Sequence, residues 1–218
     1  MKTNLTELVF ILDRSGSMAG LESDTIGGYN AMLKKQQEEP GEAIVTTVLF
    51  DHEYTLLHDR INIKGIRPIT ENEYFVGGTT ALLDAIGKTI HKIHNAQQHT
   101  SPEHQANKVL FVITTDGLEN ASREYTYLKI KKMVEQQKAK CGWEFIFLGA
   151  NIDAIATAAG LGISADRAAN YLADSQGTQL NYEAVSCAVS ELRANREIDA
   201  NWKASIDEDF AKRGKKHK

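Results

Sequence analysis

Oxygen-bearing side chains in three short segments of the sequence suit the binding of a divalent cation. The candidate ligands are Asp13, Ser15 and Ser17 in the first segment, Thr79 or Thr80 in the second, and Asp116 in the third. Carboxylate and hydroxyl oxygens, with no Cys or His among them, favour a hard ion such as Mg²⁺ or Mn²⁺ and disfavour zinc. Two carboxylates only neutralise such an ion, so it stays electrophilic and can accept an acidic oxygen from another molecule.

Strand-like and helix-like segments alternate along the chain and must position these residues. Four runs are apolar on successive residues, which is typical of strands buried on both faces of a parallel sheet. These runs cover 8–12, 43–50, 108–115 and 143–150. Apolar residues at helical spacing lie between them, over 21–38, after Thr80 and over 127–140.

A further run at 55–63 is predicted to pair antiparallel with 43–50 through a short connection. The pattern therefore predicts an α/β fold with a doubly wound, mostly parallel sheet and one antiparallel edge strand. Near the C-terminus we expect a short strand near 168–172 and then one long helix from about residue 178. Its apolar residues at helical spacing are Val185, Val189, Leu192, Trp202, Ile206 and Phe210.

The carboxyl ends of parallel strands share one edge of a sheet, where ligands of such folds bind. Asp13 and Asp116 each end a predicted strand, and Thr79 opens the helix that follows two glycines. We therefore expect the three segments to converge there. A simple turn and helix cap would explain the first segment by itself, but it would not require the matching Thr79 and Asp116.

Composition limits the possible partners and location. The 218 residues carry a net charge of −4, which implies no general attraction to nucleic acid or membranes. We expect a single domain over 1–218, with a core over about 3–200 and a solvated basic tail over 212–218. The sequence shows no signal peptide or spanning segment, and Cys141 and Cys187 lack metal-like spacing. Reduced, packed thiols and a cytoplasmic location are therefore predicted.

The fragments "DRSGS", "GGT" and "TTDG", in this order on an alternating α/β chain, resemble the metal-ion-dependent adhesion site (MIDAS) of von Willebrand factor type A (VWA) domains. The resemblance implies a Rossmann-like VWA fold. It also implies that Ser15, Ser17 and Thr79 contact the metal directly, while Asp13 and Asp116 often act through water. The fragment "GWEFIFLGAN" resembles bacterial or phage cytoplasmic members.

Three further polar residues lie near these segments but are not among the candidate ligands. Glu119 follows Asp116 closely, and we expect its side chain to be exposed to solvent. Asn151 and Asp153 follow the run at 143–150, where helix capping and contact with a ligand are equally good interpretations.

The pattern favours a binding module over an enzyme. The G-x-S-x-G elbow, the phosphate-binding P-loop and the G-x-G-x-x-G fingerprint are all missing from the sequence. The leading hypothesis is a metal-dependent protein-binding module whose protein partner donates an acidic side chain to the ion. The alternative is a metal-dependent phosphohydrolase or a regulatory subunit of a phosphotransfer system.

Overall fold

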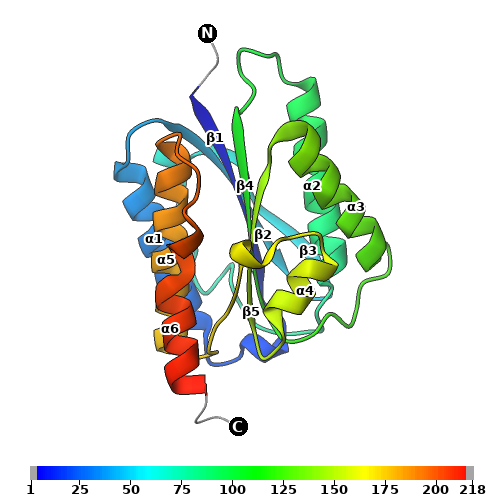
Figure 1. Cartoon of the computed structure of the whole chain (residues 1–218), viewed down its shortest axis with the longest axis vertical. Helices are drawn as coiled ribbons and strands as arrows, with labels where there is room; N and C mark the ends of the chain where they lie inside the picture. Colours follow the sequence, from blue (N-terminus) through cyan, green and yellow to red (C-terminus); the bar gives the residue numbers. More distant parts are fainter. Residues whose placement is uncertain (1–3, 215–218) are drawn as a thin grey trace.

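The computed structural model describes residues 4–214, and in this range the strands form one six-stranded sheet with the order β3-β2-β1-β4-β5-β6 (Figure 1). Only the β2–β3 pair is antiparallel, and the other neighbours run parallel. The predicted doubly wound sheet with one antiparallel edge strand is confirmed. The strands are β1 (Leu5–Asp13), β2 (Glu42–Phe50), β3 (Tyr54–Asn62), β4 (Lys108–Asp116), β5 (Glu144–Ala150) and β6 (Ala168–Asn170).

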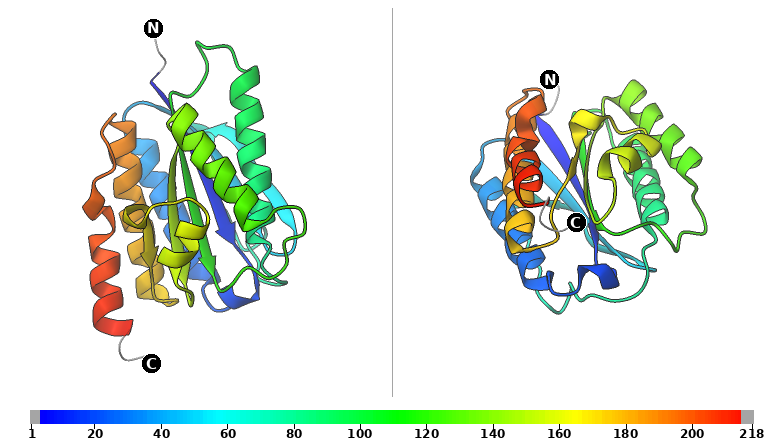
Figure 2. Two further views of the ribbon diagram at one scale, coloured as in Figure 1. Left: turned by 45° about the vertical axis from the view of Figure 1, so that its right-hand side comes forward. Right: turned by 60° about the horizontal axis from the view of Figure 1, so that its bottom comes forward.

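Helices cover both faces of the sheet (Figures 1 and 2). One face carries α1 (Glu22–Glu38), α5 (Ser175–Arg193) and α6 (Ala204–Arg213). The other carries α2 (Leu82–His99), α3 (Tyr127–Cys141) and α4 (Ala154–Gly160). Short 3₁₀ turns are η1 (Gly16–Met18), η2 (Ile63–Gly65), η3 (Ala165–Arg167) and η4 (Ala200–Lys203).

The central strand β1 explains why the strands are apolar on successive residues. Leu8, Phe10 and Leu12 belong to the core beneath α1 and α5. Val9 and Ile11 between them belong to the core beneath α2 and α3. Because side chains alternate across a strand, a strand covered on both faces needs apolar residues at every position.

The expected long C-terminal helix is wrong, because the segment forms two helices. Helix α5 begins at Ser175, where the Asp174 carboxylate accepts a hydrogen bond from the Gly177 N–H (2.8 Å), and it ends at Arg193. Asn195 then adopts a left-handed conformation, with φ of 60°. The N–H groups of Asn195 and Arg196 donate to the carbonyls of Leu192 and Glu191, each at 3.0 Å. This is the Schellman pattern of a helix end, in which Asn often replaces Gly.

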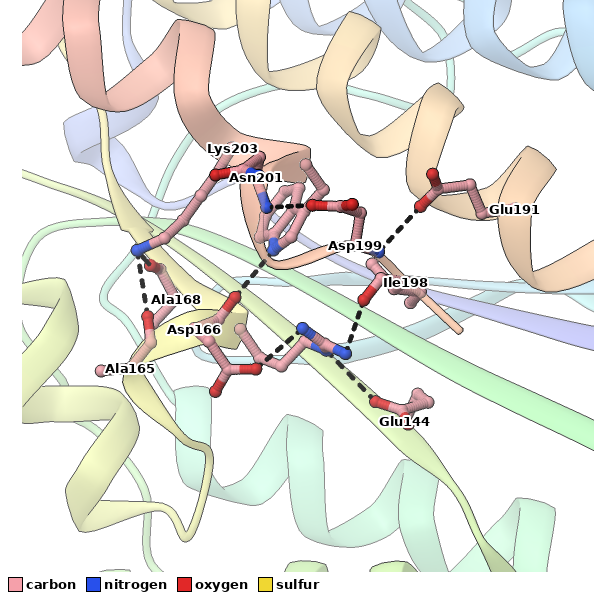
Figure 3. Close-up of polar contacts among 11 residues, drawn as sticks. Glu144, Ala165, Asp166, Ala168, Glu191, Ile198, Asp199, Asn201 and Lys203 are labelled. Atoms are coloured by element: carbon pink, nitrogen blue, oxygen red, sulfur yellow. Dashed lines mark hydrogen bonds and ion pairs between the residues drawn. The ribbon is translucent and has the colours of Figure 1, made fainter. Parts of the chain in front are cut away.

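Side-chain hydrogen bonds fix the turn between α5 and α6 against the region of β6 (Figure 3). The Lys203 ammonium donates to the carbonyl oxygens of Ala165 (3.0 Å) and Ala168 (2.6 Å). The buried Trp202 indole donates to the carbonyl of Asp166 (2.8 Å). Helices α5 and α6 pack on the same side of the sheet. The apolar residues of the sequence therefore keep helical spacing across the turn between the two helices.

Substitution of Asn195 tests this helix end. We expect Asn195→Ala to lower the free energy of unfolding by about 1 kcal/mol, because a left-handed backbone is more costly for Ala than for Asn. Asn195→Gly is the matched control and should retain wild-type stability. Urea unfolding measures both variants, and equal stability of the Ala and Gly variants would contradict this account.

The basic tail is better ordered than expected in its described part. Arg213 lies in α6, and its guanidinium donates to the carboxylates of Asp209 (2.7 Å) and Asp174 (3.1 Å). Lys212 pairs with Glu208 one helical turn earlier. Residues 215–218 of the predicted tail lie outside the described residues.

The two cysteines do not have the expected packing role. Cys141 and Cys187 are free and exposed. Within residues 4–214, none of the helices combines the length and the apolar character needed to cross a membrane.

Candidate metal centre

Asp13 ends β1 with its carboxylate buried and both oxygens held in place. One oxygen accepts the Ser15 N–H at 2.7 Å. The other accepts the Thr115 hydroxyl at 2.6 Å and the Asp116 N–H at 3.3 Å. The Tyr74 hydroxyl also donates to the Asp13 backbone carbonyl (2.5 Å). These contacts orient Asp13 through groups on β4 and on its own loop.

The two serines connect the first candidate segment to the third. The Ser15 and Ser17 hydroxyl oxygens lie 3.1 Å apart, and the Ser17 hydroxyl donates to the backbone carbonyl of Asp116. Ser15 is buried and Ser17 is exposed. The structure therefore brings Asp13, Ser15, Ser17 and Asp116 together at one edge of the sheet, as the sequence predicts.

Asp116 ends β4, and its carboxylate accepts a hydrogen bond from the Asn151 side-chain amide at 2.6 Å. Asn151 follows β5 and has φ of 56°, a left-handed conformation that Asn tolerates better than most residues. Asp153 instead caps α4 by accepting the Ala156 N–H at 3.0 Å. Of the two residues with open roles, Asn151 contacts the site and Asp153 is a helix cap.

The segment that carries Thr79 packs against the loop after β1. The Gly16 N–H donates to the Gly78 carbonyl (3.1 Å), and the Gly77 N–H donates to the Arg14 carbonyl (2.9 Å). Gly78 has φ of 73°, a conformation that is strained for residues with a side chain, and a Cβ there would lie 2.2 Å from the His52 ring nitrogen, so glycine is favoured. Thr79 itself is exposed, and its hydroxyl has no hydrogen-bond partner among residues 4–214.

The charges at this edge fit a divalent cation. Burial raises the pKa of the Asp13 carboxyl despite the hydrogen bonds from Thr115 and Ser15. Burial likewise raises the pKa of the Asp116 carboxyl, and the Asn151 hydrogen bond opposes this rise. Across residues 4–214, neither carboxylate forms an ion pair with a basic side chain. Two buried carboxylates without a cation are costly, and a bound metal ion would supply the missing positive charge.

The nearest basic side chain in the sequence, Arg14, is directed elsewhere. Its guanidinium lies 3.1 Å from the Asp51 carboxylate and 4.7 Å from the centroid of the Phe75 ring. In the described part of the chain, no group of three or more His, Cys, Asp or Glu side chains could hold a metal. The donor set is therefore limited to the two carboxylates and the neighbouring hydroxyls, which suits a hard ion.

Sequence reasoning missed the role of Glu119, and the expected exposure of its side chain is wrong. The Glu119 carboxylate is half-buried and accepts the N–H groups of Leu83 (2.9 Å), Ala121 (2.9 Å) and Ser122 (2.7 Å). It thus caps the start of α2. Asp84 of α2 is buried and accepts three backbone N–H groups from residues 123–125, each at 2.9 Å.

A polar groove lies beside Thr79. It has a volume of about 800 Å³, and its lining includes His52, Gly78, Thr79, Lys88, Asn120 and Arg123. Through this groove another molecule can reach the exposed side of Thr79.

No family model and no curated protein matches the chain, but solved structures do. Manganese-loaded TRAP protein from Plasmodium vivax is 16% identical, with a TM-score of 0.58. That match covers 83% of this chain and 73% of the Plasmodium chain. A von Willebrand factor type A structure from Catenulispora acidiphila is 12% identical, with a TM-score of 0.57. That match covers 86% of this chain and 43% of the Catenulispora chain.

Proximal thread matrix protein 1 from the mussel byssus, with a zinc-occupied MIDAS motif, is 11% identical with a TM-score of 0.54. That match covers 85% of this chain and 46% of the mussel chain. The chain thus spans about half the length of several structures that it resembles. At these identities the similarity establishes the VWA-like fold alone.

Proposed function

We propose that Asp13, Ser15, Ser17, Thr79 and Asp116 form a MIDAS-type centre that binds Mg²⁺ or Mn²⁺ and captures an acidic group of a protein partner. The observation that carries this proposal is the pair of buried carboxylates, Asp13 and Asp116, neither of which has a basic partner in residues 4–214. The loop with the two serines is bonded to both residues, through the Ser15 N–H to the Asp13 carboxylate and through the Ser17 hydroxyl to the Asp116 backbone carbonyl. The metal-loaded structures with the same fold support it.

The residues of the proposed centre would have two roles, to orient the carboxylates and to leave the outward side open. Thr115 and Ser15 orient the Asp13 carboxylate, and Asn151 orients that of Asp116. Ser17 and Thr79 are exposed, so the outward side of the centre is open to another molecule. When bound, the ion would supply an electrophilic site for a carboxylate oxygen.

We infer that the chain is a binding module and not an enzyme. Within residues 4–214, neither serine hydroxyl of the site donates a hydrogen bond to a histidine, which is the arrangement that activates a serine nucleophile. We also propose that residues 1–218 form one domain of the bacterial or phage cytoplasmic type. The free cysteines support the cytoplasmic location.

Two immobilised libraries of seven-residue peptides test the proposed function. One library has a central Asp and the other a central Asn. The remaining six positions are randomised among residues other than Asp and Glu, and the C-terminal carboxyl group is used to attach each peptide to the support. We expect the protein to bind the Asp library in Mg²⁺ and to lose this binding in EDTA, because only a carboxylate completes the coordination of the ion. The Asn library should bind at background level under both conditions.

Equal binding to the two libraries, or binding that survives EDTA, would contradict the proposed function. A parallel assay addresses the alternative of a phosphohydrolase. The protein should release no phosphate from a generic phosphoester in Mg²⁺ above the rate of a protein-free blank. Metal-dependent release that Asp13→Ala abolishes would favour the enzyme.

A further inference from the structure

Large apolar side chains are exposed in two of the loops that form the candidate centre. Phe75 is 55% exposed and precedes the Gly77–Gly78 pair, and Leu118 is 69% exposed and follows Asp116 by two residues. Isolated exposed apolar residues are common, but two of them in the loops of one site indicate a contact surface.

Phe75 is held on the β2 side of the centre. The Gly77 N–H bonds to the Arg14 carbonyl, and the Arg14 guanidinium lies 4.7 Å from the centroid of the Phe75 ring. Asp51 at the end of β2 and Thr55 in β3 fix that guanidinium, each at 3.1 Å. The ring is therefore supported from below while more than half of its surface faces solvent.

Leu118 is held on the β5 side. The Gly117 N–H donates to the Ala150 carbonyl at the end of β5 (3.1 Å), and a Cβ at Gly117 would lie 3.4 Å from the Ser17 hydroxyl oxygen. On its other side, the capping carboxylate of Glu119 anchors the chain to α2. The loop of Phe75 is thus bonded to the loop after β1, and the loop of Leu118 is bonded to the end of β5, and each adjoins a segment that carries candidate ligands.

The charged groups next to these two side chains are already occupied. Arg14 is paired with Asp51, and Glu119 accepts hydrogen bonds from Leu83, Ala121 and Ser122. Neither group offers an unpaired charge to a partner. Next to these two groups, the exposed surface that the loops offer to a partner is the apolar surface of Phe75 and Leu118.

We propose that the partner segment carries its metal-binding Asp or Glu between two large apolar side chains, one packing on Phe75 and the other on Leu118. This inference rests on the proposed function of the metal centre. The carboxylate would give metal dependence, and the flanking Leu, Ile, Met or Phe side chains would give selectivity among acidic segments. Both side chains are held by their loops before binding, which limits the entropy lost on association.

The Asp library described above also tests this inference. Peptides retained in Mg²⁺ should be enriched in Leu, Ile, Met and Phe on both sides of the central Asp. Phe75→Ser should abolish the enrichment on one side and Leu118→Ser on the other. Each change should weaken binding of a selected peptide about tenfold, as expected for the loss of one buried apolar contact.

Leu128→Ser is the matched control, because Leu128 is 64% exposed on α3 and outside the loops of the centre. It should bind the selected peptides as the wild type does. All three variants should keep the Mg²⁺-dependent rise in the unfolding midpoint, which shows that the centre is intact.

The outcomes separate the two proposals. Loss of the preference for Asp over Asn would overturn the function of the centre. Retained preference for Asp with random flanking residues would overturn the apolar contacts alone. An equal loss of binding in Leu128→Ser would also overturn the apolar contacts alone. The failure of any peptide to bind the metal-stabilised protein would overturn both proposals.

Discussion

Asp13→Ala is expected to abolish the rise in the unfolding midpoint that Mg²⁺ produces in the wild-type protein. An ion that binds only the folded state at about one hundred times its dissociation constant stabilises it by about 2.7 kcal/mol. For a chain of this length, this corresponds to a rise of about 5–10 °C. Asp13 is the best-oriented carboxylate of the centre, so its removal should eliminate the whole increment. Thermal unfolding in Mg²⁺ and in EDTA measures the difference.

Asp153→Ala provides the matched control for this experiment. Asp153 is a carboxylate at the same end of the sheet, but it caps α4. Its loss should lower stability by about 1 kcal/mol in both conditions and leave the response to Mg²⁺ unchanged. An equal metal response in Asp13→Ala and in the wild type would exclude the assigned centre.

Arg60→Met is expected to lower the free energy of unfolding by about 3–5 kcal/mol near neutral pH, because it leaves a buried carboxylate without its cation. Glu7 of β1 is fully buried, and the Arg60 guanidinium lies 2.9 Å from it. Arg60 is itself only 22% exposed. The Gln97 amide from α2 donates to the same carboxylate. Denaturant unfolding measures the loss.

The loss should depend on pH in a defined direction. Burial raises the pKa of Glu7, and Arg60 opposes this rise. Since the pKa of the folded state exceeds that of the unfolded state, ionised Glu7 costs stability as the pH rises through the folded value. Removing Arg60 raises the pKa further. The difference between variant and wild type should therefore be largest near neutral pH and shrink as the pH falls through the raised folded-state pKa of wild-type Glu7, below which the carboxyl is protonated in both proteins.

The double variant Glu7→Met and Arg60→Met is the control for this pair. Replacing both partners of a buried ion pair by apolar residues is often neutral or stabilising, so most of the lost stability should return. A destabilisation by Arg60→Met that is independent of pH would instead indicate lost packing of the arginine side chain.

The strands and the convergence of the candidate ligands could be predicted from sequence because both follow from local pattern. Runs such as 108–115 are apolar at every position, and a parallel sheet brings the ends of such runs to one edge. Asp13 and Asp116 end β1 and β4, so their proximity follows from topology alone.

The residues that support the site could not be predicted in the same way. Glu119 bonds to Leu83 across 36 positions, and Asn151 bonds to Asp116 across 35, so neither contact leaves a local pattern. The break after α5 does have a local signal, because Asn195 is suited to a left-handed helix end. The spacing of apolar residues alone does not indicate the break, since α5 and α6 both direct apolar residues toward the same face of the sheet.

Glu119 also has a consequence for the time that a ligand remains bound. Its carboxylate joins the loop after β4 to the start of α2, and the Thr80 carbonyl accepts the N–H groups of Asn120 (3.0 Å) and Ala121 (3.2 Å). These bonds link the segments that carry Thr79 and Asp116, so a ligand held by both segments keeps its two contacts as long as the link holds. Cutting the link by Glu119→Ala is therefore expected to raise the dissociation rate of such a ligand and to shorten its residence time.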